Sequence, residues 1–344
     1  MTSTVWAFAA AVSTFIISAA VGKKLIPFLH RLHYGQTILD DGPSWHKKKQ
    51  GTPTMGGIMM IIAFFAVTLV CAVLYFCFGI GADNVNEAIF PRDKVHLFAG
   101  LIMALCFAAI GFADDYIKVV KKRNLGLTAK QKLVLQFASA ALYLGILAAG
   151  GYTTQTIIPF VGYVDLGFFY YIIAAVLIVG TVNAVNLNDG IDGLCGSVTF
   201  FAALGFMVIA AMLGYNGVTF ESAALAGACL GFLVWNFNPA KVFMGDTGSL
   251  FLGGALCALA FALQAPILLI PIGMCYYIEM FSIMLQVSYF KITHGKRLFK
   301  MSPIHHHFEL CGWSEKKIVN VFSAATVVFA AIAVVIAYFG IVMI

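Results

Sequence analysis

Long runs of apolar residues, separated by short polar segments, repeat along the whole chain. A helix needs roughly 20 mostly apolar residues to cross a bilayer, and several runs approach that length without the alternation typical of a membrane β-strand. Because every backbone amide in lipid needs a partner within its own segment, we predict that these runs are helices. The ten predicted spans are 5–21, 58–78, 97–112, 133–149, 166–182, 194–213, 222–235, 249–263, 266–289 and 318–344.

The weaker parts of the pattern predict three local features. The seventh and eighth spans are short, so a tilted or partly re-entrant course is an option for both. Residues 152–165 alternate enough between apolar and polar positions to permit a short hairpin. Glu279 is the one acid predicted to lie inside a span, where an ionised carboxylate is costly and needs a partner, a proton or nearby water.

The composition of the 344-residue chain supports the same fold class. Apolar residues make up 61% of it and charged residues 10%, against about 25% charged residues in a typical soluble domain. We therefore predict an all-α polytopic membrane protein in which residues 1–344 form a single integral membrane domain. The lipid bilayer is its expected surrounding, and no nucleic-acid partner is expected.

The basic residues divide unevenly between the two predicted sides. Nineteen of the 21 Lys and Arg residues lie on the side of the first, third, fifth, seventh and ninth loops. Cytoplasmic loops are rich in Lys and Arg, so we expect this side to face the cytoplasm and both termini to lie outside it. These loops are expected near 22–57, 112–132, 183–197, 236–249 and 290–317. The same side holds nine of the 15 acids, which topology does not require; a metal- and phosphate-handling site is one explanation.

Two adjacent aspartates, Asp114 and Asp115, close the third predicted span within GFADDYIK. Successive helical residues point about 100° apart. If the helix continues, one carboxylate is therefore free to approach a metal or act as a base, while its neighbour holds the backbone or a lysine. Lys118 follows one turn later, at a spacing suited to phosphate oxygens. An ordinary basic cap with its countercharges is the alternative interpretation.

Two further segments combine acids with amides or glycines. The sequence NAVNLNDGIDG (183–193) offers oxygen ligands and amides suited to a nucleobase edge, or else forms a polar turn. Asp246 lies between glycines in FMGDTGSL, where a helix N-terminus would present free amides to an anion and the carboxylate would point toward Mg²⁺. A helix-capping role for Asp246 is an equal alternative.

Two loops add histidines, lysines and threonines. The sequence SPIHHHFE (302–309) contains three successive histidines, which do not share one helical face and lack the spacing of a zinc site. Histidines near a phosphate donate hydrogen bonds and change charge near neutral pH. The first loop ends in HKKKQGTPTMGG (46–57), a basic run followed by a glycine-rich entry to the second span.

Five motifs in this order, GTPTMGG, GFADDYIKVVKK, NAVNLNDGIDGL, FMGDTGSL and SPIHHHFE, resemble those of the polyprenyl-phosphate N-acetylhexosamine-1-phosphate transferases. The resemblance covers the chain from Gly42 to Trp313. The triple-histidine loop is similar to that of the branch whose members transfer a phospho-N-acetylmuramoyl-pentapeptide.

The resemblance implies a reaction, a cofactor and a location. UDP-N-acetylmuramoyl-pentapeptide would react with undecaprenyl phosphate to give UMP and the pyrophosphate-linked lipid I of peptidoglycan biosynthesis. The implied cofactor is Mg²⁺. The implied location is the bacterial cytoplasmic membrane, with the active site facing the cytoplasm, and a homodimer is one option for the assembly. Direct attack by the lipid phosphate is favoured, and a covalent aspartyl step stays open.

The resemblance also implies roles for individual residues. Asp246 is implied as the metal ligand, and Asp114 is favoured over Asp115 as the base or nucleophile. The implied catalytic residues are Asp114, Asp115, Asp246, His305 and Lys118. The implied substrate-binding residues are Lys49, Thr54, Lys122, Lys130, Asn183, Asn186, Asp189, Asp192, Asn236, Phe243, Gln286 and His306. Asn188 and the stretch 235–239 depart from the family pattern.

Other classes of protein are compatible with a polytopic helical chain. A secondary transporter would place ionisable groups near the middle of the membrane on broken helices, whereas nine acids gather on one face here. A channel or scaffold has no need of paired aspartates and an Asn-rich loop. The nearest rival is a sister transferase that uses UDP-N-acetylglucosamine, which shares the chemistry but lacks the triple-histidine pattern.

Overall fold

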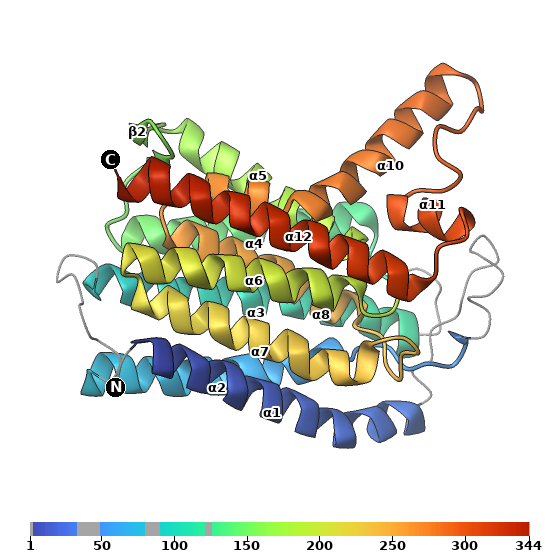
Figure 1. The fold of residues 1–344 in the computed structure, drawn as a ribbon, viewed down its shortest axis with the longest axis horizontal. Helices are drawn as coiled ribbons and strands as arrows, with labels where there is room; N and C mark the ends of the chain where they lie inside the picture. The colour runs from blue at the N-terminus through green and yellow to red at the C-terminus, as the bar shows by residue number, and fades with distance from the viewer. Residues whose placement is uncertain (1–2, 33–48, 80–89, 121–125, 344) are drawn as a thin grey trace.

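The computed structural model describes residues 3–32, 49–79, 90–120 and 126–343. Helices make up most of this part of the chain, which confirms the all-α class (Figure 1). The helices are α1 (Ser3–Arg31), α2 (Gly57–Phe78), α3 (Phe90–Val120), α4 (Ala129–Ala149), α5 (Phe169–Leu187), α6 (Leu194–Leu213), α7 (Asn216–Asn236), α8 (Gly245–Ala262), η2 (Pro266–Leu268), α9 (Leu269–Ile272), α10 (Met274–Ile292), α11 (Ile304–Leu310), α12 (Glu315–Ala337) and η3 (Tyr338–Val342). An antiparallel hairpin joins β1 (Gln155–Ile158) to β2 (Gly162–Asp165), which confirms the hairpin predicted within 152–165.

Nine of the described helices are long and apolar enough to span a membrane, and one bent pair brings the number to ten. The bent pair is the ninth predicted span, in which Pro266–Ile272 meets α10 at an angle of 78°. Pro271 lacks an amide proton and Gly273 directly follows α9, so the helical hydrogen-bond ladder is interrupted there. The seventh and eighth spans, for which a re-entrant course was an option, are the continuous helices α7 and α8.

Helix α8 forms the centre of the bundle. Every residue from Thr247 to Ala262 is buried, and the helix packs against α2, α3 and α5. Its sequence explains this position, because small and apolar residues cover all of its faces and such a helix is stable only when enclosed. Asp246 lies in its first turn, so the packing of α8 fixes where that carboxylate lies.

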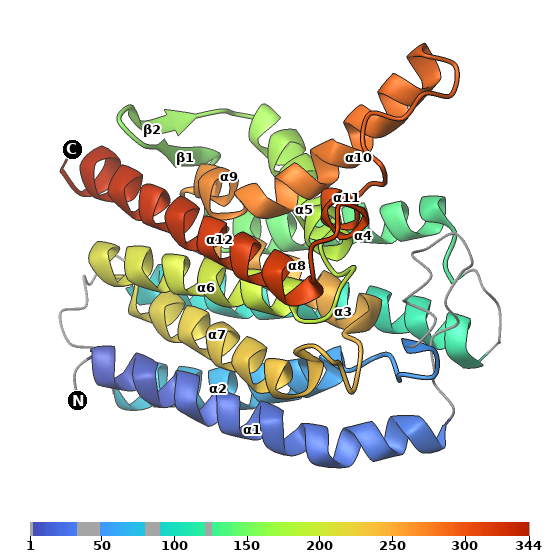
Figure 2. The same cartoon turned by 45° about the vertical axis from the view of Figure 1, so that its right-hand side comes forward.

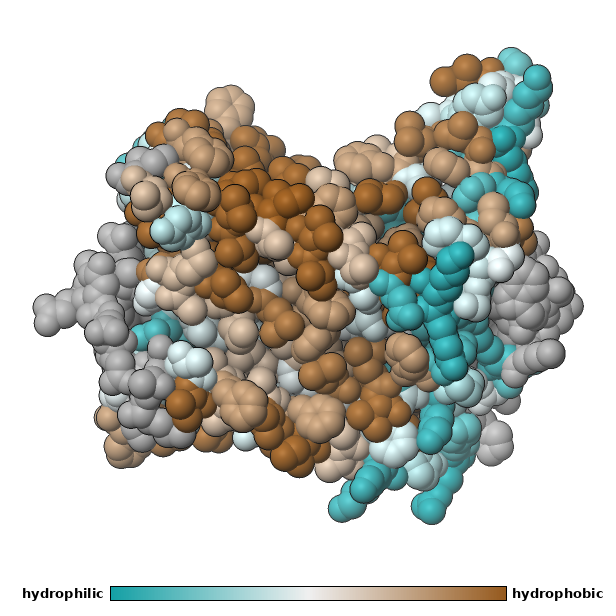
Figure 3. All heavy atoms as spheres, in the orientation of Figure 1, coloured by the Kyte–Doolittle hydropathy of each residue, from teal (hydrophilic) through white to brown (hydrophobic). Residues whose placement is uncertain are grey.

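The two ends of the bundle differ in polarity. Figures 1 and 2 show the long helices running side by side, with both ends of the chain at the same end of the bundle. Hydrophilic residues gather at the opposite end, near α11 and the tip of α10, and a broad apolar band covers the middle (Figure 3). The loops before α8 and α12 lie at this polar end, in agreement with the uneven division of Lys and Arg along the sequence.

Glu279 is not alone among acids within the membrane-spanning helices. The helix α7 begins at Asn216, earlier than predicted, so that Glu221 falls within it and is only 2% exposed. Packing of α7 against α1, α2 and α6 encloses the polar residues around Glu221. The expectation that Glu279 is the one acid inside a span is therefore wrong.

Candidate active site

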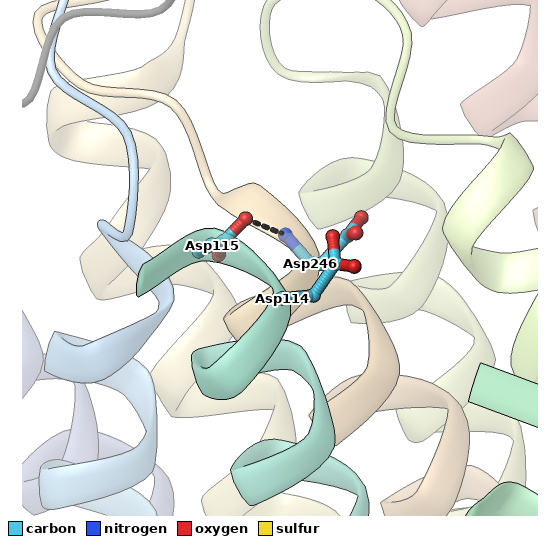
Figure 4. A group of neighbouring side chains, drawn as sticks. All are labelled: Asp114, Asp115 and Asp246. Carbon is cyan, nitrogen blue, oxygen red and sulfur yellow. Dashed lines mark hydrogen bonds between the residues drawn. The ribbon is translucent and has the colours of Figure 1, made fainter. Parts of the chain in front are cut away.

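Three aspartates meet at the polar end of the bundle. Asp114 and Asp115 lie near the C-terminal end of α3, and Asp246 lies in the first turn of α8. Each offers one carboxylate oxygen, and these three oxygens lie within 4.8 Å of one another. Figure 4 shows the carboxylates of Asp114 and Asp246 side by side, while Asp115 points toward the backbone of Asp246. The chain therefore brings together the acids of two separate motifs.

Asp115 holds the start of α8. Its carboxylate accepts hydrogen bonds from the backbone N–H of Asp246 (3.2 Å), the backbone N–H of Thr247 (2.9 Å) and the Thr247 hydroxyl (2.7 Å). The first N–H groups of a helix lack partners within the helix, and a carboxylate there also complements the helix dipole. Asp115 thus binds the backbone of α8, whereas Asp114 faces Asp246 and binds Lys118 and the Leu127 N–H. Which of the two aspartates acts as the base stays a prediction. Asp246 does not cap its own helix, since Asp115 supplies that cap from α3.

Two lysines contact Asp246, and one of them also contacts Asp114. Nζ of Lys118 lies 2.5 Å from Oδ2 of Asp114 and 3.0 Å from Oδ2 of Asp246, so it bridges the two acids. Nζ of Lys132, from α4, lies 2.9 Å from the same Asp246 oxygen. Oδ1 of Asp114 accepts a hydrogen bond from the Leu127 N–H at 2.8 Å. The two cations offset the repulsion between neighbouring carboxylates and stand where phosphate oxygens would find positive charge.

Lys132 was missing from the predicted site residues, whereas Lys130 was among them. Both lie in the first turn of α4, which begins at Ala129, and residues two apart on a helix point about 200° apart. Lys132 reaches Asp246 and Lys130 is exposed. The helical period distinguishes the two lysines only when the position of α8 is known. Lys122, also predicted, lies outside the described residues.

Close backbone contact sets the distance between α3 and α8. A Cβ atom at Gly111 would overlap the carbonyl group of Asp246 and would lie 2.7 Å from the Thr247 nitrogen. Glycine at this position thus lets the two helices approach until Asp114, one turn further along α3, reaches Asp246. The buried Thr54 hydroxyl lies beside Gly245, directly before Asp246.

Two asparagines of the segment 183–193 lie one turn apart at the end of α5. Nδ2 of Asn186 donates to Oδ1 of Asp246 at 2.7 Å and to the Ser249 hydroxyl at 2.8 Å. Nδ2 of Asn183 donates to Oε1 of Gln136 in α4 at 2.7 Å. The segment is therefore more than a polar turn, because Asn186 orients Asp246 and Asn183 ties α5 to α4.

Asp189 follows α5 within the same segment. Burial, together with repulsion from Asp246, Asp115 and Asp192, raises the pKa of Asp189 to about 8. Its carboxyl group is therefore mostly neutral at pH 7, and a nearby positive charge would favour its ionisation. The preceding Asn188 is fully buried, and its side-chain amide has no hydrogen-bond partner among the described residues.

A second polar cluster lies beside the aspartates and joins four segments of the chain. Nζ of Lys49 lies 2.7 Å from a carboxylate oxygen of Asp192 and 2.7 Å from one of Glu315, which opens α12. Asp192 also accepts hydrogen bonds from the Ala240 N–H (2.9 Å) and the Asn238 amide (3.2 Å). Lys49 and Asp192, both predicted to bind substrate, neutralise each other in this structure. Glu315 was missed as a member of this cluster.

Asn236 and Phe243 connect loops at the same end. Oδ1 of Asn236 accepts a hydrogen bond from the Gly193 N–H (2.9 Å), and Nδ2 donates to the Val242 carbonyl (2.9 Å). The backbone N–H of Phe243 donates to the Pro53 carbonyl at 2.8 Å. These contacts hold the segments that carry Lys49 and Asp246 against each other.

The histidine motif forms α11 and the residues around it. Oε1 of Gln286 accepts a hydrogen bond from the Phe299 N–H at 2.8 Å, which anchors the loop before α11 to α10. Nδ1 of His306 lies 2.6 Å from Oε2 of Glu309. The side chain of His305 is fully buried and faces α10.

The aspartate cluster fits a hard divalent cation. Mg²⁺ prefers oxygen ligands and usually takes one or two carboxylates together with phosphate oxygens. Asp114 and Asp246 present adjacent carboxylates, whereas both oxygens of Asp115 already accept hydrogen bonds from α8. Among the described residues, the metal-capable cluster contains neither cysteine nor histidine. The donor chemistry thus suits Mg²⁺ better than a softer metal.

Comparison with known proteins shows that this chain is similar to transferases. The sequence pattern of glycosyl transferase family 4 matches residues 97–264, a range that includes all three aspartates. A curated relative from Halalkalibacterium halodurans, named phospho-N-acetylmuramoyl-pentapeptide-transferase, is 45% identical over 322 residues, which is 93% of this chain and 94% of the relative. A relative of the same name from Bacillus cytotoxicus is 46% identical over 309 residues, 90% of either chain.

Proposed function

Because this chain belongs to the phospho-N-acetylmuramoyl-pentapeptide-transferase family of phosphosugar-transferring enzymes, we propose that it moves phospho-N-acetylmuramoyl-pentapeptide from its UDP donor to undecaprenyl phosphate. The products are lipid I and UMP, in peptidoglycan biosynthesis. The observation that carries the proposal is the pair of facing carboxylates, Asp114 and Asp246, flanked by Lys118 and Lys132.

The position of this pair suits a reaction between one soluble and one lipid-bound substrate. The acceptor keeps its hydrocarbon tail in the bilayer, at about 0.8 kcal/mol per buried CH₂ group, so only its phosphate reaches the interface. The donor is a polyanion, which lysines at the polar end of the bundle attract. Helix ends at that interface are where the two phosphates can meet.

The charged residues divide the work of the reaction. Lys118 and Lys132 bind phosphate oxygens in place of the carboxylates when the substrates enter. Asp114 accepts a proton from the acceptor phosphate where that phosphate still carries one. An oxygen of the acceptor phosphate then forms a bond to the β-phosphorus of the donor. The bond from that phosphorus to the bridging oxygen breaks, and UMP leaves with the bridging oxygen.

Asp246, with Asp114 beside it, would hold Mg²⁺. When bound, the ion supplies positive charge that offsets repulsion between the phosphates and stabilises the departing UMP. Neighbouring side chains hold the two acids in position for the ion. Asn186 holds one oxygen of Asp246, and Asp115 fixes the helix turn on which Asp246 stands.

Asp114 is better placed to act as a base than as a nucleophile. The Leu127 N–H fixes one of its oxygens, and the other becomes free to take a proton when Lys118 turns from it to phosphate. We therefore favour direct attack by the acceptor phosphate. Incubation with donor alone separates the two routes, because direct attack releases no UMP without acceptor, whereas a covalent aspartyl intermediate releases about one UMP per enzyme.

We also propose that the polar end faces the cytoplasm of a bacterial cell and that both termini lie outside. Cys311 is exposed between α11 and α12, at the polar end. A membrane-impermeant maleimide should leave Cys311 unmodified in sealed right-side-out vesicles and modify it after permeabilisation. Modification in the sealed vesicles would reverse the proposed orientation.

The choice of donor tests the proposed reaction itself. Purified protein supplied with undecaprenyl phosphate and Mg²⁺ should release UMP from UDP-N-acetylmuramoyl-pentapeptide and not from UDP-N-acetylglucosamine. Release from UDP-N-acetylglucosamine alone would assign the chain to the sister reaction. Absence of release from both donors would remove the proposed function. Substitution of the exposed hairpin acid, Asp165→Asn, at the opposite end of the bundle serves as a control for handling and folding.

A further inference from the structure

Glu279 lies inside α10 and is fully buried. An acid in such a place needs a specific partner, because the membrane interior gives a carboxylate no water to replace the interactions it loses. The partner is His305 of α11, which is also fully buried, with Nδ1 3.0 Å from Oε1 of Glu279. The two residues are 26 positions apart and come from separate helices, so this contact depends on the fold.

The second oxygen of Glu279 reaches the backbone of the same histidine. The N–H of His305 donates to Oε2 of Glu279 at 3.4 Å. One carboxylate therefore holds both the imidazole ring and the first turn of α11. With Nδ1 beside Glu279, Nε2 is the ring nitrogen that faces Gly190. Within α11, the His306 ring lies 4.2 Å from the His305 ring, and His306 pairs with Glu309.

The far side of the His305 ring supports the Asn-rich loop. A Cβ atom at Gly190 would overlap Nε2 of His305, so the backbone of this loop rests directly on the imidazole. Nε2 is buried and has no hydrogen-bond partner within the described ranges. Gly190 directly follows Asp189, so the position of the ring decides where Asp189 lies relative to the aspartate cluster.

We propose that Glu279 is a positioning residue for the donor site. It fixes the orientation of His305, and the imidazole in turn sets the position of the 188–190 turn relative to the aspartate cluster. That turn presents Asp189 to the nucleoside diphosphate sugar. In this arrangement His305 acts through the loop that it supports. The residues of the aspartate cluster, and not His305, contact the reacting phosphates. The inference rests on the proposed function, because it assigns the loop to the UDP donor.

The test separates binding of the donor from binding of the acceptor. In Glu279→Gln the amide keeps the size of the carboxyl but can turn its NH₂ toward Nδ1, so the ring loses its fixed orientation. We expect the KM for the UDP donor to rise about tenfold, while the KM for the lipid acceptor and the apparent melting temperature in detergent stay near native values. Glu221→Gln is the matched control, because it neutralises another buried membrane acid away from this loop.

Gly190→Ala tests the contact between the Asn-rich loop and His305 from the side of the loop. It also provides a second variant should Glu279→Gln fail to fold. It should raise the donor KM in the same way, and the double variant should be no worse than the more severe single variant, because both changes break one chain of contacts.

Three results would overturn the inference. The first is a donor KM that stays native in either single variant. The second is a fall in kcat alone, which would place His305 at the chemistry. The third is a rise in both KM values together with a fall in the melting temperature, which would make the role of the pair merely structural. Native protein that fails to release UMP would refute the proposed function instead, so the two failures are distinguishable.

Discussion

Asp115→Asn is the most informative single substitution in the aspartate cluster, because the structure gives Asp115 a role that differs from that of its neighbour. The carboxylate receives three hydrogen bonds from the first turn of α8. Asparagine has one acceptor oxygen, so its NH₂ group would face at least one N–H donor. An unsatisfied buried N–H costs about 1–3 kcal/mol, and the lost charge at the helix N-terminus costs about 1 kcal/mol more. We expect a total destabilisation of about 2–4 kcal/mol.

The assay is a thermal melt followed by intrinsic tryptophan fluorescence in detergent, with UMP release measured on the same preparation. At about 2 °C per kcal/mol for a chain of this size, the apparent melting temperature should fall by roughly 4–8 °C. Thr247→Val is the graded companion, because it removes one hydroxyl donor and leaves both backbone hydrogen bonds. If Asp115→Asn abolishes UMP release while the melting temperature stays native, Asp115 acts in the chemistry and the capping role is refuted.

Three further substitutions test the surroundings of the cluster. Lys132→Ala removes a cation 2.9 Å from Asp246 and should lower kcat/KM about tenfold or more, whereas the exposed Lys24→Ala should not; equal activities would contradict the site. Gly111→Ala forces α3 away from α8 and should cost about 1–3 kcal/mol and most of the activity, so native turnover would refute the required close approach. Asp189 has its pKa raised to about 8, against about 3.9 when unfolded, so its ionisation destabilises the native protein by up to about 1.4 kcal/mol per pH unit as pH rises from about 4 to 8. In EDTA, Asp189→Asn should therefore gain melting temperature relative to native as pH rises through that window, and a constant difference would contradict the shift.

The sequence was sufficient to predict the spans because burial in lipid imposes a strong and simple pattern. The ends of the helices were less predictable, since hydropathy no longer decides them once the chain leaves the apolar layer. The third span was expected to end at 112, but α3 continues to Val120. Its last turns are therefore helical, and this explains why Asp114 and Asp115 face different partners.

The bend in the ninth span was present in the sequence as Pro271 and Gly273, but the apolar run around them looked continuous. No local sequence pattern could predict the contact that this bend allows. The contact between Glu279 and His305 requires α10 and the loop after it to return toward the bundle. A buried acid could be identified from hydropathy, whereas its partner could not.

The candidate site also has a part that the sequence predicted and a part that depends on tertiary contacts. The division of loops between the two sides and the family resemblance predicted that Asp114 and Asp246 lie together, and their carboxylates do meet in the structure. The roles of their neighbours depend on tertiary contacts. Lys132 reaches Asp246 only because α4 packs beside α3 and α5, and Glu315 reaches Lys49 only because α12 begins next to the first loop. The roles assigned to individual site residues stay predictions.

Direct measurement of metal binding tests the central claim that Asp114 and Asp246 hold a divalent cation against a diphosphate. Mn²⁺, used as a probe for Mg²⁺, can be titrated into purified protein in the presence of the UDP donor and followed by electron paramagnetic resonance. We expect saturable binding by native protein and by the Asp165→Asn control, and affinity reduced by about 10–100-fold or more in Asp246→Asn. Native affinity for Mn²⁺ in Asp246→Asn would contradict the claim.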